Sequence, residues 1–215
     1  MDGVELPDGL NGNVLLIGFG RFGQVASQAL LARGFDVAII DKDTEMIRAA
    51  ANFGFKVYYG DGERLDVLRA SGGTTARAIA ICIDDRRATS KIVELVKAEF
   101  PHARVLARSF DREHALELKA KDVDYQIREM FESAVVFGEQ ALRSLGVSDL
   151  EAAEIAAEVR RRDAERVALE LTAGLAAGSS LLIGNAPKPQ PFTPPRRAAR
   201  ALNEEAAAAL AREQQ

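Results

Sequence analysis

The stretch that decides the fold is residues 13–24, Asn-Val-Leu-Leu-Ile-Gly-Phe-Gly-Arg-Phe-Gly-Gln. Its apolar run, residues 14–17, is typical of a strand that is buried on both faces. The run ends at a glycine-rich turn, residues 18–23, and an amphipathic stretch follows directly. The sequence therefore predicts a strand, a glycine turn and a helix.

The three glycines of this turn have different physical roles. Gly18 permits the tight turn, Gly20 lets the backbone approach a phosphate closely, and Gly23 lets the helix pack against the strand. The amides of Gly20, Arg21 and Phe22 are expected to be unpaired donors at a helix N-terminus, where the helix dipole also favours an anion. The turn is therefore predicted to bind a phosphate group.

An acidic residue follows the second expected strand. Asp41 comes after a helix-terminating Gly34 and the strand 37–40, at the spacing that is typical of a ribose-binding acid. A carboxylate there accepts hydrogen bonds from a ribose diol and repels a 2′-phosphate. We expect an adenosine-containing ligand without a 2′-phosphate. A βαβ turn that binds nothing is the alternative interpretation.

Strands and helices alternate at short intervals from residue 13 to about residue 127. We expect strands at 13–18, 36–40, 55–59, 78–83, 104–108 and 124–127, and helices at 22–33, 44–52, 63–70, 86–99 and 111–120. Asp43-Thr44 and Asp111 are expected to cap two of these helices. The alternation predicts an α/β fold, a Rossmann-like doubly wound parallel sheet with helices on both faces.

Successive strands are followed by residues that suit a ligand. Gly18, Asp41, Asp61 and Asp84 follow the first four strands, and ligands bind outside the carboxyl ends of such strands. Helix capping is the alternative for Asp61 and Asp84. After the fifth strand, Arg108 can bind a phosphate or a carboxylate. The predicted nucleotide site comprises Gly18, Phe19, Gly20, Arg21, Phe22, Gly23, Asp41, Lys42, Asp61, Ile83, Asp84 and Arg108.

Composition bounds the class of protein. The chain has 215 residues and a net charge of −4 without a basic stripe, which argues against a nucleic-acid partner. Cys82 is the single cysteine, so no disulfide can form within the chain, and its apolar neighbours predict that it lies in the core. His102 and His114 are expected on the surface, and no metal site is predicted. With no apolar stretch near 18 residues, we expect the chain itself to be soluble and cytoplasmic.

Two further helices are expected after the sheet. Residues 129–145 carry a broad apolar stripe that should pack on their own domain or on a partner subunit. Residues 149–172 predict a long, mostly solvated helix. We divide the chain into a linker (1–12), a nucleotide-binding domain (13–128), dimerising and peripheral helices (129–175) and a Pro/Ala-rich tail (176–215) that we expect to be disordered.

No catalytic set accompanies the binding motif. The part after residue 127 is too short and too helical for an ordinary substrate domain, and the chain has no Tyr-x-x-x-Lys motif. No Ser/His/Asp or Cys/His set is apparent either. The sequence therefore favours a ligand sensor over an enzyme, while an NAD-dependent oxidoreductase and a structural assembly module without a nucleotide stay as alternatives.

Seven segments together carry a family resemblance. They are Gly18-Phe-Gly-Arg-Phe-Gly-Gln24, Ile40-Asp-Lys-Asp43, Gly54-Phe-Lys-Val-Tyr-Tyr-Gly-Asp61, Ile83-Asp-Asp85, Phe100-Pro-His102, Ala107-Arg108 and Glu129-Met-Phe-Glu132. This combination resembles the RCK or TrkA-N domain, which controls potassium conductance, and more closely the C-terminal domain of Kef-type glutathione-regulated potassium efflux systems. The resemblance spans roughly residues 13–165, whereas plain dehydrogenases share only the first two segments.

The resemblance implies ligands and partners. Family members bind AMP or NAD(H) in the Rossmann pocket and form homodimers through the helix after the sixth strand. Glutathione closes the attached transmembrane potassium/proton antiporter, and bulky glutathione conjugates open it. A quinone-reductase-like ancillary subunit is a further implied partner, and the implied location is the cytoplasmic face of the bacterial inner membrane. The abrupt start at Met1 favours an excised domain over a separate subunit, and a nucleotide-gated RCK subunit of another potassium transporter or channel is the alternative.

Glutathione is an anionic peptide at neutral pH, so its site needs cations. Arg21 matches the family motif and is the best candidate. Lys119 stands where the family is expected to show an arginine, and Asp163 where it is expected to show an amide. Ordinary solvated charges are the alternative interpretation of Arg21 and Lys119.

Overall fold

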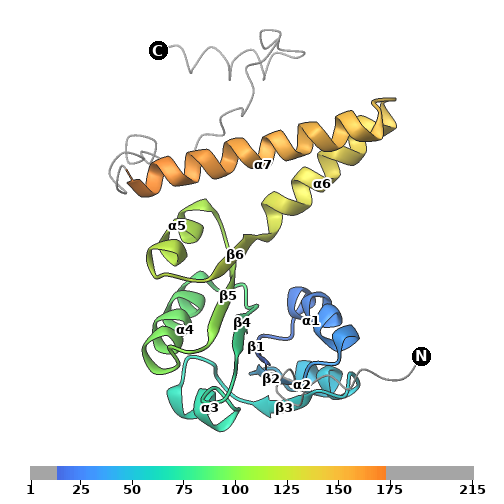
Figure 1. The fold of residues 1–215 in the computed structure, drawn as a ribbon. Coiled ribbons are helices and arrows are strands. Elements are labelled where there is room, and N and C mark those ends of the chain that lie inside the picture. Colours follow the sequence, from blue (N-terminus) through green and yellow to red (C-terminus); the bar gives the residue numbers. More distant parts are fainter. Residues whose placement is uncertain (1–13, 173–215) are drawn as a thin grey trace, which may run out of the picture. The chain divides into compact units, whose positions relative to one another are not determined.

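Six parallel strands form one sheet in the computed structural model, which describes residues 14–172. The strands are β1 (Val14–Ile17), β2 (Val37–Asp41), β3 (Lys56–Tyr59), β4 (Ala78–Ile81), β5 (Arg104–Ser109) and β6 (Tyr125–Arg128). Their order in the sheet is β3-β2-β1-β4-β5-β6, as in a doubly wound Rossmann fold (Figure 1). The predicted fold class is confirmed. The predicted linker 1–12 and tail 176–215 lie outside the described residues.

The sheet separates two layers of helices. The helices between the strands are α1 (Arg21–Arg33), α2 (Thr44–Ala51), α3 (Leu65–Ala70), α4 (Arg86–Glu99) and α5 (Arg112–Ala120). Figure 1 shows α1 and α2 on one face, and α3 and α4 on the other. Because successive side chains of a strand point to opposite faces, Leu15 and Ile17 belong to the core under α3 and α4, whereas Val14 and Leu16 belong to the core under α1 and α2.

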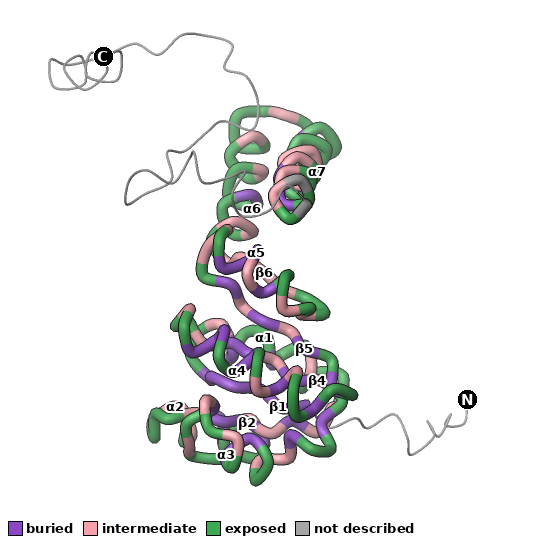
Figure 2. Tube along the Cα trace, turned by 90° about the vertical axis from the view of Figure 1, so that its left-hand side faces the viewer, coloured by how far each residue is buried: buried purple, intermediate pink, exposed green. Residues whose placement is uncertain are grey.

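Burial follows this layering. All four residues of β1 are buried, since parallel neighbours flank the strand on both sides, and Figure 2 shows the buried residues concentrated on the inner strands. Cys82 is buried in the core as predicted, and burial raises the pKa of its thiol to about 12. The thiol is therefore protonated and unreactive at neutral pH.

The N-termini of α2 and α5 follow the sequence signals. Asp43 accepts a hydrogen bond from the Glu45 N–H (2.8 Å) and Asp111 from the His114 N–H (2.8 Å), so both predicted N-caps are confirmed. At α4, however, Asp85 rather than Asp84 accepts the capping bond. β4 also ends at Ile81, two residues before the predicted end, because the ladder with β5 stops at the pair Ile81 and Ala107. Ile83 is therefore released from the sheet.

His114 corrects a sequence-based expectation. It is fully buried, not on the surface, because it lies four residues before Leu118 on the buried face of α5. Its Nδ1 accepts the Phe110 N–H at 3.0 Å, and its Nε2 lies 3.3 Å from the Ser90 hydroxyl oxygen. Burial lowers the pKa of His114, so the imidazole is neutral and carries its proton on Nε2. His102 is exposed, as predicted.

Two helices follow the sheet, α6 (Glu129–Ser144) and α7 (Asp149–Thr172), which confirms both expected helices. The described residues divide into two units, 14–156 and 157–172, with the division inside α7. Most of α7 is exposed or half-buried, as expected, but Ala152, Ala156, Asp163 and Val167 are buried. Within residues 14–172, no helix is both long and apolar enough to cross a bilayer.

Candidate functional site

The glycine turn after β1 has the geometry that its sequence predicts. Gly18 has φ +92°, and a Cβ on it would lie 2.6 Å from the Cγ2 atom of Ile83. A Cβ on Gly23 would lie 2.2 Å from the carbonyl oxygen of Gly18, so α1 packs directly on the turn. A Cβ on Gly20, in contrast, would have no atom within 4 Å. The turn is therefore closed against the sheet at Gly18 and Gly23 and open to solvent at Gly20.

This open side presents unsatisfied backbone donors. Gly20 is the N-cap of α1, without a side-chain capping bond, and no acidic residue lies in the first helical turn. Within residues 14–172, no group accepts a hydrogen bond from the amides of Gly20, Arg21 and Phe22. Such a helix N-terminus combines free N–H groups with the positive end of the helix dipole. The phosphate seat, as we call residues 20–22, can therefore bind an anion.

Asp41 has a structural role that the sequence did not reveal. Its Oδ2 accepts the Phe19 N–H at 2.7 Å, and its Oδ1 accepts the Asp43 N–H at 2.8 Å. The carboxylate thus fastens the glycine turn to the end of β2. Each carboxylate oxygen has a further lone pair, so Asp41 can still accept a hydrogen bond from a ribose hydroxyl.

Phe19 and Gln24 stabilise the glycine turn through a buried ring and a side-chain hydrogen bond. The Phe19 ring is fully buried and packs edge-on against Phe53 and Phe55, with ring centres 5.4 and 6.0 Å away. Phe19 therefore offers only its backbone to the site. Gln24 donates a hydrogen bond from Nε2 to the Phe19 carbonyl oxygen at 3.0 Å, a contact that sequence reasoning missed. Asp41 and Gln24 together fix both backbone polar groups of Phe19.

A hollow of about 70 Å³ opens beside the turn at the carboxyl ends of the strands. Five of the predicted residues line it, namely Gly18, Asp41, Lys42, Asp61 and Ile83. Gly60 and Gly62, which were not among the predicted site residues, line it as well. A Cβ on Gly62 would lie 2.6 Å from the Cγ2 atom of Ile17, so the backbone here lies directly on the strand end. Asp84 does not line the hollow and is exposed.

Asp61 has a local partner, as its capping alternative suggested. Its Oδ1 accepts the Glu63 N–H at 2.9 Å, in the turn that precedes α3. The N-cap position of α3 is Arg64, however, so Asp61 shapes the turn and does not cap the helix. Its carboxylate lines the hollow from the β3 side.

Arg108 lies on β5 and does not line the hollow. Its Nη2 is 2.7 Å from the Oε2 atom of Glu129, and its guanidinium carbon lies 5.4 Å from the centre of the Phe22 ring. The side chain is 23 % exposed. Arg108, which was predicted to bind a phosphate or a carboxylate, therefore already forms an ion pair with Glu129. The sequence analysis did not predict this pair.

The three candidate glutathione residues lie on three different helices. Arg21 on α1 and Lys119 on α5 are both exposed, and within the described residues no hydrogen bond or ion pair joins them. Asp163 lies on the part of α7 that belongs to the second unit, and it is only 4 % exposed. In residues 14–172, no group of three or more acidic, histidine or cysteine side chains could hold a metal ion.

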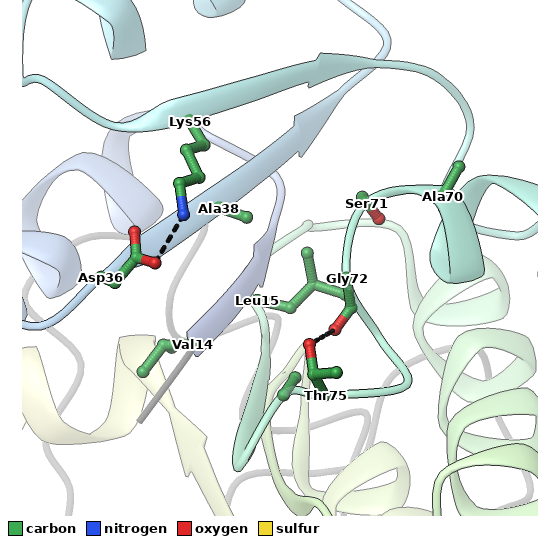
Figure 3. A pocket seen from close by; sticks show the side chains of 10 residues that line it. Val14, Leu15, Asp36, Ala38, Lys56, Ala70, Ser71, Gly72 and Thr75 are labelled. Atoms are coloured by element: carbon green, nitrogen blue, oxygen red, sulfur yellow. Dashed lines mark hydrogen bonds and ion pairs between the residues drawn. The ribbon is translucent and has the colours of Figure 1, made fainter. Parts of the chain in front are cut away.

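A larger hollow, of about 250 Å³, lies at the opposite ends of the strands. Figure 3 shows its lining, with the ion pair between Lys56 and Asp36 (2.6 Å) and the hydrogen bond from Thr75 to the Gly72 carbonyl oxygen (3.3 Å). Its acid and base neutralise each other, and no helix N-terminus is among its lining residues. It lacks the features that bind a phosphate, so the hollow beside the glycine turn is the candidate functional site.

The strand order, the glycine turn after β1 and the acid after β2 define the Rossmann-like class of nucleotide-binding folds. The family model of the TrkA-N domain matches residues 14–129. The chain therefore belongs to the TrkA-N family.

Within this family, the chain is most clearly similar to proteins of potassium efflux systems. The chain is 45% identical, over 94% of its length, to a "Glutathione-regulated potassium-efflux system protein" of Haemophilus influenzae, of which it spans about a third (32%). It is 33% identical to a solved structure described as "Shewanella denitrificans Kef CTD in AMP bound form", with a TM-score of 0.71 over 76% of this chain and 100% of that one. The "GsuK channel bound to NAD" shares the fold (18% identity, TM-score 0.54, 63% of this chain, 24% of that chain). The predicted resemblance to Kef-type regulatory domains is confirmed.

Proposed function

We propose that this chain is the nucleotide-binding regulatory domain of a glutathione-gated potassium efflux system, a potassium/proton antiporter. In this proposal, residues 13–128 form the nucleotide-binding domain and residues 129–175 the dimerising and peripheral helices. The domain acts at the cytoplasmic face of the inner membrane, where it controls an attached transmembrane antiporter. An ancillary quinone-reductase-like subunit is a further proposed partner.

The observation that carries the proposal is the phosphate seat beside Asp41. Three free amides at a helix N-terminus suit a phosphate, and a carboxylate at the end of β2 suits a ribose. Both belong to a chain that is 33% identical to an AMP-bound Kef CTD. We therefore propose AMP as the preferred ligand and NAD(H) as the second candidate, since the NAD-bound structure is only 18% identical to this chain.

The exposed apolar side chains of α6 support a homodimer. Met130 and Phe137 are each 77 % exposed, seven residues apart on the helix, and Val136 is 57 % exposed. Large apolar side chains on a helix face usually mark an interface when they are contiguous. We infer that α6 packs against α6 of a second copy of the chain.

Glutathione and its conjugates are proposed as gating ligands at this dimer interface, with Arg21, Lys119 and Asp163 as candidate residues. The two exposed cations can each bind a carboxylate of glutathione, an anionic peptide. If calorimetry finds the same glutathione affinity in the wild type and in Arg21→Ala, Arg21 is not part of the site.

Gly20→Val tests the nucleotide site. The free protein has space for the Cβ of the new side chain, since no atom would lie within 4 Å of it, and the φ of Gly20 is an ordinary −67°. The added methyl groups stand where a phosphate would approach the turn. We expect a melting temperature within about 4 °C of the wild type, since valine is a poorer N-cap residue than glycine, and at least a roughly tenfold loss of AMP affinity, as for a lost charge-assisted contact.

Ala26→Val is the matched control, because it adds a valine at an exposed position of the same helix. It should bind AMP like the wild type. Calorimetric titration with AMP, NADH, NADPH and adenosine then ranks the ligands. Equal AMP affinity in Gly20→Val and in the control would overturn the proposed site, and hydride transfer from NADH to a substrate would favour the oxidoreductase alternative.

A further inference from the structure

Arg108 connects the phosphate seat to the helix that we propose as the dimer interface. Its guanidinium lies against the ring of Phe22, a residue of the seat, at 5.4 Å from the ring centre. The same guanidinium pairs at 2.7 Å with Glu129, the first residue of α6. The three residues belong to one unit of the chain. One side chain therefore contacts both the ligand end of α1 and the start of α6.

This ion pair can be broken at low cost. The Glu129 side chain is 41 % exposed and that of Arg108 is 23 % exposed, so water screens the attraction between them. Glu129 also lies at the N-terminus of α6, where the helix dipole stabilises a carboxylate without any partner. Glu129 can therefore lose Arg108 without being left as an uncompensated charge.

A nucleotide phosphate is the stronger partner for Arg108. A phosphate monoester carries a charge of about −1.5 to −2 at neutral pH, against −1 for the carboxylate, and accepts a forked pair of hydrogen bonds from a guanidinium. The phosphate would lie on the seat amides, next to the Phe22 side chain that the guanidinium already contacts. A phosphate bound there would compete with Glu129 for the Arg108 guanidinium.

We propose that Arg108 exchanges partners, from Glu129 in the free domain to the ligand phosphate in the bound domain. The exchange releases the start of α6 from β5, so that occupancy of the nucleotide site changes how firmly α6 is held. Arg108 therefore positions α6 in the free domain and binds the ligand phosphate in the bound domain. The inference rests on the proposed function, because it needs a nucleotide in the site and α6 in the dimer interface.

Reciprocal coupling makes the exchange measurable. If Glu129 competes with the phosphate, Glu129→Gln frees Arg108 and raises the affinity for AMP by up to about fivefold, because the gain cannot exceed the free energy of the screened ion pair that the nucleotide otherwise has to break. Adenosine has no phosphate, so its affinity should stay within about twofold of the wild type. Arg108→Gln should lower AMP affinity, and the gain from Glu129→Gln should vanish in the double variant.

Glu132→Gln is the matched control, since it removes the same charge from the same first turn of α6. It should leave the ratio of AMP to adenosine affinity as in the wild type. Sedimentation of the full chain adds a second readout. AMP should shift the dimer dissociation constant of the wild type and should leave that of Arg108→Gln unchanged.

The outcomes separate the two proposals. If the wild type binds AMP and Glu129→Gln leaves the AMP-to-adenosine ratio unchanged, the partner exchange is wrong and the nucleotide site stands. The same ratio gain in Glu132→Gln as in Glu129→Gln would also overturn the exchange, because a general charge effect would then explain both. If the wild type binds no AMP, the proposed function fails and the inference fails with it.

Discussion

Asp41→Asn tests whether the ligand-free site is held in its binding geometry. The carboxylate of Asp41 accepts two short backbone hydrogen bonds, from the Phe19 N–H at 2.7 Å and from the Asp43 N–H at 2.8 Å. An asparagine has one acceptor oxygen and one amide nitrogen, so it keeps one of these bonds and turns a donor toward the other N–H. The variant therefore loses one charge-assisted bond in the absence of any ligand.

The size of the effect follows from this count. A hydrogen bond to a charged group contributes about 1.5 to 3 kcal/mol. Since Asp41 is half-buried, we use the lower part of that range, about 1.5 to 2 kcal/mol. For a chain of this size, each kcal/mol moves the melting temperature by about 2 to 4 °C, so we expect a decrease of about 3 to 8 °C.

The assay is thermal unfolding by circular dichroism without nucleotide, with Asp61→Asn as the control. Asp61 also follows a strand, but it accepts a single N–H, from Glu63. An asparagine can keep that one bond, so the control should stay within about 0.5 kcal/mol of the wild type. An Asp41→Asn variant that melts with the wild type would refute the reasoning, even if it binds AMP weakly, because Asp41 would then act only on the ligand.

Two further predictions concern the helices. Because burial lowers the pKa of His114 below its ordinary value of about 6.5, the unfolded chain binds more protons below that pH, so stability should fall as pH drops from 6.5. Urea titrations at pH 7.5 and 5.5 should show this loss in the wild type and a smaller one in His114→Gln; equal losses would exclude His114 as the cause. Phe137→Asp should turn the proposed dimer into a monomer in native mass spectrometry, whereas Val57→Asp, at an exposed valine of the edge strand β3 (38 % exposed), should stay dimeric; a dimeric Phe137→Asp would place the interface elsewhere.

The sequence predicted the fold well because its signals are local. Apolar runs, capping acids and the glycine turn each act within a few residues of the chain, and the strands and helices lie close to their predicted positions. The order of the strands in the sheet, in contrast, is not a local property of the sequence. It depends on where the chain crosses over the sheet, which the alternation of elements restricts but does not fix. The exposure of all four β3 residues follows from their place at the sheet edge, not from their sequence.

The site was predictable only in part, because some of its residues are required by local backbone geometry and others depend on how the side chains pack. The turn glycines and the strand-end acids could be named because backbone geometry demands those residue types at those places. The contact of Arg108 with Glu129 joins two side chains whose distance apart depends on packing. The bond from Gln24 to the Phe19 carbonyl oxygen is local, but it depends on which way the Gln24 side chain turns. His114 shows how periodicity could have helped, since its spacing to Leu118 places it on the buried face of α5 despite its charged neighbours.

The contacts of the turn also explain why the site can be both rigid and coupled to α6. Asp41 and Gln24 fix the N–H and the C=O of Phe19, and the Phe19 ring is anchored in the core, so the ligand need not spend binding energy on ordering the turn. A rigid seat cannot transmit occupancy through its own movement. A side chain that changes partners can carry the signal to α6 instead, and Arg108, which touches both Phe22 and Glu129, has the contacts for this role.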